Sequence, residues 1–319
     1  MKILANDGIS PAGIAKLEAA GVTVSTEHVP QDQLIDAINT QGYVGLMVRS
    51  ATKVRQDLID ACPNLKMIGR GGVGMDNIDV DYARGKGLAV FNTPAASSQS
   101  VAELVMGHLF DVARSIFDSN RQMPGRGANE FKALKKAYGK GTELRGKTLG
   151  IVGFGRIGRS LASYALGCGM DVIACDPYAQ DGKVTVMIGA NQTVEVDVPR
   201  HDLEAVLAQS DFVSLHVPKQ ADGSAVLGAA QLAAMKPSAC VVNAARGGVI
   251  DEDALMAALD NGSLRYAALD VFENEPTPRE DLLAHPKVAL TPHIGAATTE
   301  AQDRIGVELA DQILANLNA

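Results

Sequence analysis

The sequence predicts an α/β protein in which a doubly wound parallel-sheet domain is inserted into a smaller α/β domain. Two observations support this fold. Short apolar runs alternate with helical patterns along the whole chain, which is typical of parallel strands joined by helices. A glycine-rich motif, Gly153-Phe154-Gly155-Arg156-Ile157-Gly158, stands near the middle of the 319-residue chain, so a first domain of ordinary size fits before it.

The first part of the chain predicts a small flavodoxin-like α/β domain. A strand is expected at 2–5, and Ser10-Pro11 then supplies a helix N-cap followed by proline in the first turn. Gly21 ends this helix. The further elements are strands at 43–48, 65–68 and 88–91, with a helix at 56–61.

The second domain is expected to begin near Asn92-Thr93-Pro94 and to contain a long helix from Ser100 to Ile116. Beyond the glycine motif, strands are predicted at 170–175, 212–216, 240–243, 266–271 and 288–290, and helices at 203–208, 229–235 and 253–259. A hairpin is expected within 182–202. A final helix carrying Ile305, Leu309, Ile313 and Leu317 returns to the first domain. The predicted domains are therefore 1–95 with 291–319, and 96–290.

The glycine motif has the context of a dinucleotide site of the Rossmann type. It follows the apolar run 149–152, opens a helix, and precedes Asp176 at the end of the next apolar run. In such a site Gly153 permits a tight turn, Gly155 lets the backbone approach a pyrophosphate, and Gly158 allows close packing of helix on strand. An acid at 176 would repel a 2′-phosphate, which favours NAD over NADP.

The composition excludes several other classes of protein. A net charge of −8 argues against a nucleic-acid surface, and no apolar run is long enough to span a membrane. The start of the chain lacks the features of a signal peptide, and four scattered cysteines indicate reduced, buried thiols. We therefore expect a cytoplasmic protein without a metal site. The basic stretch 121–147 is expected to be a solvated face, or to help hold an anionic substrate across a subunit boundary.

A ketone that receives a hydride needs a proton, and histidine is the first candidate to supply it. We expect His28, His201 and His285 to lie on the surface, and His108 to be a helix-face residue. His216 ends the strand predicted at 212–216 and should pack near the cofactor. His293, in Thr291-Pro292-His293-Ile294-Gly295, follows the last strand. Two more residues at strand ends complete a candidate site: Glu275 as a carboxylate partner for the imidazole, and Arg246 as a cation for a 2-oxo acid.

Four segments together resemble the D-isomer-specific 2-hydroxyacid dehydrogenases. They are the glycine motif, 243–247, Asp270 with Glu275-Pro276, and 292–295. The resemblance implies catalytic roles for Arg246, Glu275 and His293, contact of Asp270 with the nicotinamide carboxamide, and contact of Asp176 with the adenosine ribose. The remaining residues expected at the NAD site are Gly153, Gly155, Arg156, Ile157, Gly158, His216, Val217, Pro218, Ala244, Ala245, Gly295 and Ala296.

Within that family, the loops 46–53 and 70–79 are most similar to those of D-3-phosphoglycerate dehydrogenases. The resemblance implies substrate binding by Arg49, Ser50, Arg70, Gly72, Val73, Gly74 and Arg246. The backbone amides near Val73 and Gly74 would hold the carboxylate, and Arg49 or Arg70 would lie nearer a phosphate. The expected reaction is then oxidation of 3-phospho-D-glycerate to 3-phosphohydroxypyruvate in serine biosynthesis, by a homodimer or larger homo-oligomer.

Two features depart from the phosphoglycerate dehydrogenase pattern. Ala96-Ser97-Ser98 stands where those enzymes usually have Gly-Asn-Thr or Gly-Asn-Ser, and the sequence ends at Ala319 without the serine-sensing domain that many of them carry. The first weakens the assignment of substrate, and the second argues against feedback by serine through that domain. A hydroxypyruvate or glyoxylate reductase, or another D-2-hydroxyacid dehydrogenase, is therefore the alternative. An NADH-sensing protein that acts through partners, like the corepressors of the family, is a more distant one.

Overall fold

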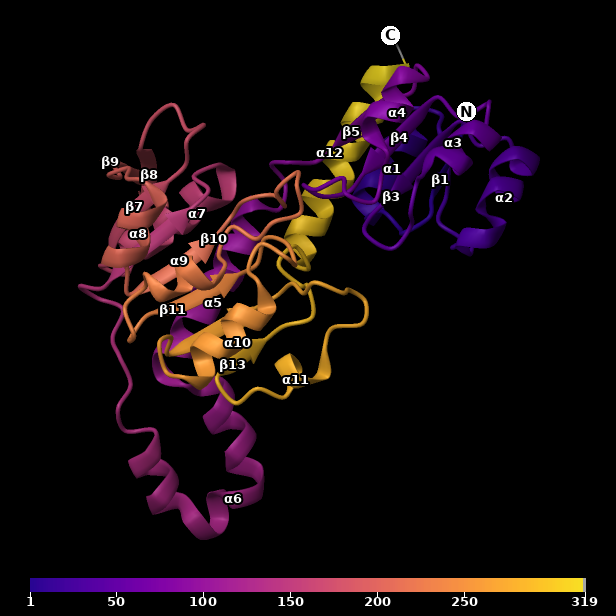
Figure 1. Ribbon diagram of the computed structural model, residues 1–319. Coiled ribbons are helices and arrows are strands. Elements are labelled where there is room, and N and C mark those ends of the chain that lie inside the picture. Colours follow the sequence, from indigo (N-terminus) through magenta and orange to yellow (C-terminus); the bar gives the residue numbers. More distant parts are fainter. Residues whose placement is uncertain (318–319) are drawn as a thin grey trace. The chain divides into compact units, whose positions relative to one another are not determined.

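The computed structural model describes residues 1–317 and divides the chain into two compact units (Figure 1). Unit 1 comprises residues 1–100 and the chain from Ala296 onward, and unit 2 comprises Val101–Gly295. The chain therefore passes from one unit to the other after Ser100 and after Gly295, whereas the predicted crossings lie after residues 95 and 290.

Unit 1 is a five-stranded parallel sheet in the order β2-β1-β3-β4-β5. The strands are β1 (Lys2–Ala5), β2 (Thr23–Ser25), β3 (Gly45–Val48), β4 (Met67–Arg70) and β5 (Ala89–Asn92). This is the strand order of flavodoxin-like folds, in which the chain reverses direction across the sheet between the first and third strands. The expected flavodoxin-like sheet is confirmed, and β2 is a strand outside all the predicted ones.

Helices cover both faces of this sheet because alternate strand residues point to opposite sides. Ile68 packs with α2 (Leu34–Gln41), α3 (Gln56–Ala61) and α4 (Val80–Gly85), while its neighbour Met67 packs with α1 (Pro11–Ala19) and α12 (Thr299–Leu317). A short 3₁₀ helix, η1 (Gln31–Gln33), precedes α2. The last helix thus returns to the first sheet, as the apolar spacing of 305–317 predicts. Ser10 caps α1 by accepting a hydrogen bond from the Gly13 amide at 3.3 Å.

Unit 2 has a six-stranded parallel sheet in the order β13-β12-β11-β10-β6-β7. The strands are β6 (Thr148–Val152), β7 (Asp171–Cys175), β10 (Phe212–Leu215), β11 (Cys240–Asn243), β12 (Tyr266–Leu269) and β13 (Val288–Leu290). Beyond β7, Arg200 forms a single parallel bridge with Ala174. This bridge takes the place of the third strand in the usual dinucleotide-binding order. The predicted doubly wound sheet is confirmed.

The two faces of this sheet also carry separate cores. One face packs on α5 (Ser98–Arg114) and α7 (Arg156–Gly167) through residues such as Phe212 and Val242. The other packs on α8 (Leu203–Gln209), α9 (Ala229–Ala233), α10 (Glu252–Asp260) and α11 (Glu280–Leu283) through residues such as Val213 and Val241. Because both faces are covered, the central residues of these strands are mostly apolar.

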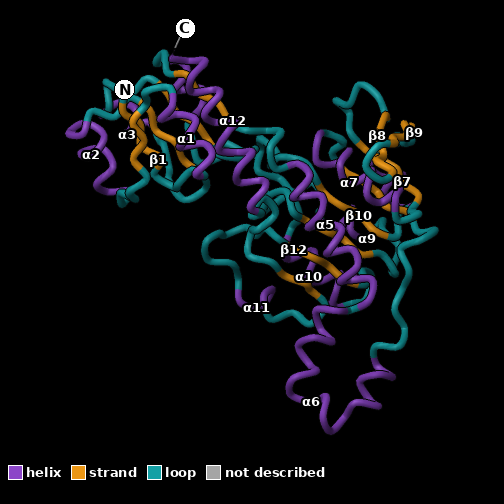
Figure 2. The backbone as a smooth tube through the Cα atoms, turned by 180° about the vertical axis from the view of Figure 1, so that it is seen from behind, coloured by secondary structure: helices purple, strands orange, loops and turns teal. Residues whose placement is uncertain are grey.

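Two appendages extend from unit 2 (Figure 2). The helix expected to reach Ile116 instead ends at Arg114, because Ser115 adopts a left-handed backbone conformation with φ 51°. The chain continues as α6 (Ile116–Ala137), which is kinked at Glu130 and carries part of the basic stretch. The second appendage is the expected hairpin, in which β8 (Lys183–Ile188) pairs antiparallel with β9 (Gln192–Asp197).

Candidate functional site

Three glycines shape the loop between β6 and α7, each for a different steric reason. Gly153 has φ +94°, and a Cβ there would collide with the backbone of His216. A Cβ on Gly158 would collide with the carbonyl oxygen of Gly153. Gly155 has an ordinary φ of −78°, and nothing lies within 4 Å of the position its Cβ would take. Two of the glycines therefore build the loop, whereas the third leaves open space beside the N-terminus of α7.

The acid predicted to follow the loop is held against it. Asp176, which follows β7, accepts hydrogen bonds from the Phe154 amide through Oδ2 at 2.7 Å and from the Tyr178 amide through Oδ1 at 2.8 Å. A pyrophosphate requires open space at a glycine and backbone amides at a helix N-terminus. A ribose requires an adjacent carboxylate. These residues fit a dinucleotide cofactor.

His216 follows β10, which lies beside β6 in the sheet. The hydroxyl of Ser214 lies 2.9 Å from its Nε2. Its Nδ1 is buried and has no hydrogen-bond partner among the residues that the structure describes. Burial lowers the pKa of His216 to about 4, so the imidazole is neutral at pH 7.

A histidine and a glutamate of unit 2 form a close pair. The Nδ1 of His293 lies 2.7 Å from Oε2 of Glu275, whose Oε1 accepts a hydrogen bond from the Phe272 amide at 2.9 Å. Burial raises the pKa of the Glu275 carboxyl, but these two hydrogen bonds and the charge of Arg246 lower it by more, so its pKa lies below the ordinary value. An ionised carboxylate can only accept, so Nδ1 carries the proton and Nε2 is free to exchange one.

The backbone around His293 is strained and is held by a buried acid. His293 has φ +53°, an uncommon conformation for a residue with a side chain. Asp270, which is 1% exposed, accepts hydrogen bonds from the Ile294 amide at 2.8 Å, the Gly295 amide at 2.9 Å and the Thr291 hydroxyl at 2.7 Å. The carboxylate thus fixes the turn that presents the imidazole.

Arg246 lies on a loop that packs directly on the loop of Glu275. The side chain of Asn243 donates to the Arg246 carbonyl at 2.9 Å and accepts from the Ala245 amide at 3.0 Å, which fixes the loop. The next residue must be glycine, because a Cβ on Gly247 would collide with the carbonyl of Phe272. The structure therefore brings together the three predicted catalytic residues, Arg246, Glu275 and His293, at the carboxyl ends of the strands of unit 2.

The predicted substrate loops lie side by side in unit 1, since β3 and β4 are paired and the register sets Val48 opposite Arg70. Arg49 and Ser50 follow β3. The carboxylate of Asp7 accepts from the Arg49 amide at 2.6 Å, and from the amide and hydroxyl of Thr52 at 3.1 and 2.6 Å. Asn77 donates to the carbonyls of Arg49 and Thr52 at 2.8 and 2.6 Å. Neither Asp7 nor Asn77 was among the predicted site residues.

Gly72 leaves room for the side chain of Arg70 in the second loop. A Cβ on Gly72 would collide with the guanidinium of Arg70. The Gly72 amide donates to the Thr93 hydroxyl at 2.7 Å, so the start of the loop is fixed to the end of the neighbouring strand. Val73 is 37% exposed and Gly74 is half-buried. The loop therefore presents two residues to solvent while its start stays packed.

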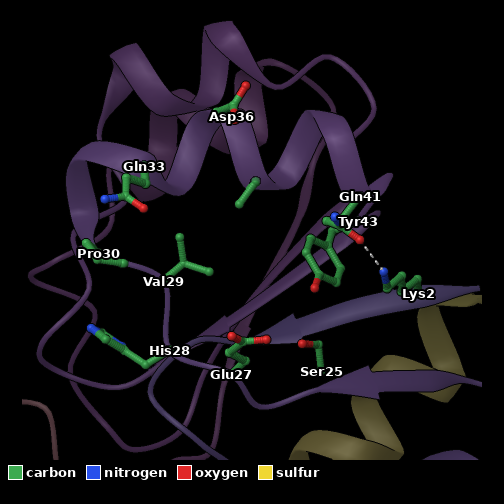
Figure 3. Close-up of a pocket in the computed structure, with 11 residues that line it drawn as sticks. Lys2, Ser25, Glu27, His28, Val29, Pro30, Gln33, Asp36, Gln41 and Tyr43 are labelled. Atoms are coloured by element: carbon green, nitrogen blue, oxygen red, sulfur yellow. Dashed lines mark hydrogen bonds between the residues drawn. The ribbon is translucent and has the colours of Figure 1, made fainter.

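Unit 1 contains two pockets of different character. One, of about 510 Å³, has Arg49 in its wall together with Asp7, Ser10 and Gln302. The other, of about 440 Å³, is lined by residues of mixed charge such as Lys2, Glu27, His28 and Asp36 (Figure 3). Lys2 donates to Gln41 across its rim at 2.9 Å. None of the predicted site residues lines the second pocket, so nothing connects it with the chemistry expected here.

Some sequence expectations for individual residues need correction. His285 is 7% exposed rather than on the surface, because its imidazole accepts from the Lys287 amide and pairs with Asp260 at 3.2 Å in a packed turn. Cys168 and Cys175 are half-buried rather than buried. All four cysteines are free thiols.

Comparisons with known proteins identify relatives of the whole chain. Residues 106–295 match the family model described as D-isomer specific 2-hydroxyacid dehydrogenase, NAD binding domain. A hydroxypyruvate reductase of Thermotoga maritima is 44% identical over 297 residues, which cover 92% of this chain and 90% of the relative. A D-3-phosphoglycerate dehydrogenase of Methanocaldococcus jannaschii is 42% identical over 98% of this chain, but this chain spans only 57% of that protein's length.

A solved structure shows the same architecture. The crystal structure of a protein from Thermus thermophilus superposes with a TM-score of 0.85 at 30% sequence identity, over 100% of this chain and 97% of the other. The NAD-binding model covers the glycine loop, Asp176, and the predicted site residues Arg246, Glu275 and His293. The chain therefore belongs to the D-isomer specific 2-hydroxyacid dehydrogenase family and is an oxidoreductase that binds a nicotinamide cofactor.

Proposed function

We propose that this enzyme transfers a hydride reversibly between NAD and C2 of a small D-2-hydroxy acid, with 3-phospho-D-glycerate as the preferred substrate. The observation that carries the proposal is the 2.7 Å pair of His293 and Glu275 on the same face of unit 2 as the Arg246 loop. When bound, the nicotinamide accepts or donates the hydride. Every other step is assigned to side chains of this chain.

In the oxidation direction, Nε2 of His293 takes the proton of the substrate hydroxyl as the C2–H bond breaks. The hydrogen leaves C2 with its electron pair, and the hydroxyl oxygen becomes the carbonyl oxygen. Glu275 accepts the Nδ1 hydrogen of His293, so it orients the ring and stabilises the imidazolium that forms. The guanidinium of Arg246 binds the substrate carboxylate and the oxygen on C2, one N–H to each. In the reverse direction His293 returns the proton to the alkoxide.

NAD is proposed over NADP because of Asp176. Its carboxylate lies beside the glycine loop through the hydrogen bond to the Phe154 amide. A ribose hydroxyl can donate to such a carboxylate, whereas a 2′-phosphate would meet a like charge. The expected ratio of kcat/KM for NADH over NADPH is therefore at least about tenfold, which corresponds to about 1.4 kcal/mol.

The choice of substrate rests on the loops of unit 1. Arg49 follows β3, and Arg70 ends the neighbouring strand β4. We assign them to a substrate phosphate because arginine pairs with phosphate through two hydrogen bonds. We assign Ser50 and the loop 72–74 to the remainder of the substrate, with the amides near Val73 and Gly74 facing its carboxylate. A place in serine biosynthesis follows from that substrate.

Reduction of hydroxypyruvate or glyoxylate is a second candidate function. It is favoured by the 44% identity to a hydroxypyruvate reductase over 90% of that protein's length, and such a substrate needs no phosphate-binding residue. The two functions are separated by measuring kcat/KM with NADH for 3-phosphohydroxypyruvate, hydroxypyruvate and glyoxylate. A preference for the phosphorylated acid that disappears in Arg49→Met and Arg70→Met supports the first function. A preference for hydroxypyruvate or glyoxylate that neither variant alters establishes the second.

The acid–base assignment has its own test. Replacing His293 with alanine should lower kcat by about 10²-fold or more, since general acid–base catalysis contributes about that much. The dissociation constant for NADH should stay within about threefold, which fluorescence titration measures. His201→Ala, an exposed histidine of the same unit, serves as the control. A His293→Ala enzyme that turns over at the wild-type rate would refute the role of His293.

We also propose that the protein is a homodimer. The α5–α6 region of unit 2 exposes four large apolar side chains, namely Phe110 at 45%, Ile116 at 50%, Met123 at 43% and Phe131 at 59%. Such a group on one region is typical of a protein interface. Sedimentation equilibrium should give twice the chain mass of 33.4 kDa, and a monomer would refute the proposal.

Four free thiols favour a reducing compartment, and we propose the cytoplasm. Within residues 1–317, no helix has the length and apolar character needed to cross a membrane.

A further inference from the structure

A buried histidine outside the proposed acid–base pair is connected to it by hydrogen bonds. His108 lies on α5 and is 4% exposed. Its Nε2 lies 3.0 Å from Oγ1 of Thr291, a residue 183 positions further along the chain. Thr291 stands between β13 and the turn that carries His293. The imidazole therefore touches the segment that presents the proposed acid–base residue.

The direction of these hydrogen bonds follows from counting hydrogens. The Thr291 hydroxyl has one hydrogen, and it donates that hydrogen to Oδ1 of Asp270 at 2.7 Å because a carboxylate can only accept. Towards His108 the same hydroxyl must then accept. Nε2 of His108 is therefore the protonated nitrogen. Burial lowers the pKa of His108, and the charges of Asp270 and Asp111 oppose this shift only in part, so the ring is neutral and exists as the Nε2–H tautomer.

This series of hydrogen bonds ends at the strained turn that contains His293. Oδ1 of Asp270 accepts from both the Thr291 hydroxyl and the Ile294 amide, and Oδ2 accepts from the Gly295 amide. His293 lies inside this turn with φ +53°. A left-handed residue with a side chain persists only where its surroundings hold it. If the Thr291 hydroxyl rotates, Asp270 loses one of its three donors and the turn is held less firmly.

We propose that His108 is a positioning residue for the acid–base reaction. Its Nε2–H orients the Thr291 hydroxyl towards Asp270, and Asp270 in turn holds the backbone of His293 in the conformation that presents its imidazole. His108 is assigned a role through Thr291 and Asp270 and no contact with the substrate or the cofactor. The inference rests on the proposed catalytic role of His293, and it adds a residue that lies on a helix far from that motif in the sequence.

The experiment compares variants that keep or remove the donor. His108→Gln retains an N–H at the position of Nε2, whereas His108→Leu removes it. We expect the Leu variant to lower the single-turnover rate of NADH oxidation about tenfold, with KM for the 2-oxo acid and the dissociation constant for NADH within about twofold of wild type. The Gln variant should recover the rate to within about threefold of wild type.

A double-mutant cycle tests the connection through the hydroxyl. Thr291→Val removes the hydroxyl while keeping the shape of the side chain, and it should lower the rate about as much as His108→Leu. The double variant should be no slower than either single variant, because both changes break the same series of hydrogen bonds. Additive losses, or a Gln variant as slow as the Leu variant, would overturn the inference. Val112→Ala, a truncation at a fully buried site of α5, should lower the melting temperature without changing the rate.

A readout without turnover distinguishes failure of this inference from failure of the proposed function. In protein labelled with ¹⁵N-histidine, the long-range ¹H–¹⁵N spectrum at pH 7 should show His108 as the neutral Nε2–H tautomer. The Nε2 proton should exchange more slowly in wild type than in Thr291→Val. An Nδ1–H tautomer, or exchange unaffected by loss of the hydroxyl, refutes the positioning role whatever substrate the enzyme takes. An inactive wild type with the expected spectrum would refute the proposed function instead.

Discussion

The half-buried imidazole of His216, whose Nδ1 is buried, should make the folded protein less stable in mild acid. Its pKa is lowered to about 4 by burial, while a histidine in an unfolded chain titrates near about 6.5. The unfolded chain therefore binds a proton that the folded chain does not bind between these two pH values. The sign follows: the free energy of unfolding falls as the pH decreases from about 6.5 to about 4, and the loss is complete below that.

The magnitude follows from the same two values. The difference of about 2.5 units between the folded and unfolded pKa values changes the free energy of unfolding by at most about 3 kcal/mol. About 2 kcal/mol of this is lost at about pH 5. Urea unfolding followed by circular dichroism should show this loss as a difference between wild type and His216→Gln, since glutamine can bond to Ser214 but does not titrate. His201→Gln, which changes an exposed histidine, should behave like wild type. If wild type and His216→Gln lose the same free energy between about pH 7 and about pH 5, the reasoning is wrong.

Three further predictions concern glycine and cysteine residues. Gly155→Ala should fold with an unchanged melting temperature, because its Cβ meets nothing within 4 Å, but it should weaken NADH binding at least about tenfold. Gly167→Ala, at an equally open position, is the control and should bind NADH normally. Equal NADH affinities of the two variants in titrations would contradict the cofactor site. Gly247→Ala should abolish measurable turnover, since its Cβ displaces the backbone of Phe272; an active variant would show that the loop of Glu275 tolerates movement. Burial raises the pKa of the Cys240 thiol to about 12, so iodoacetamide at about pH 8 should leave Cys240 unmodified in folded protein and alkylate it in urea, as peptide mass spectrometry would show.

The sequence allowed the parallel sheets to be predicted because their signals are local. Ser10 and Pro11 set the start of α1 through capping chemistry, and apolar runs separated by helical patterns set the strands. The pairing of His293 with Glu275 was also expected, since both residues follow strands of one parallel sheet and the carboxyl ends of such strands share an edge.

The features that escaped prediction depend on contacts between distant residues. The contact of His108 with Thr291 appears only when α5 is placed beside that residue, which is 183 positions away. The break at Ser115 gives no local signal, because serine is neither a proline nor a glycine and takes a positive φ only in this context. The third strand position next to β7 is reduced to the single bridge of Arg200, and a bridge of one residue leaves no periodicity to detect.

The bond between Asp176 and the Phe154 amide has a consequence for changing the cofactor preference of this enzyme. Exchange of an acid at this position for a small neutral residue is a natural first step towards NADP use. Here the same exchange would also free the amide of a residue inside the glycine loop. Asp176→Asn removes the negative charge but keeps an oxygen that can accept from that amide, whereas Asp176→Ala removes both. A designer who seeks NADP activity should therefore begin with asparagine and add a cation near Tyr178, so that the pyrophosphate loop keeps its support while the charge changes.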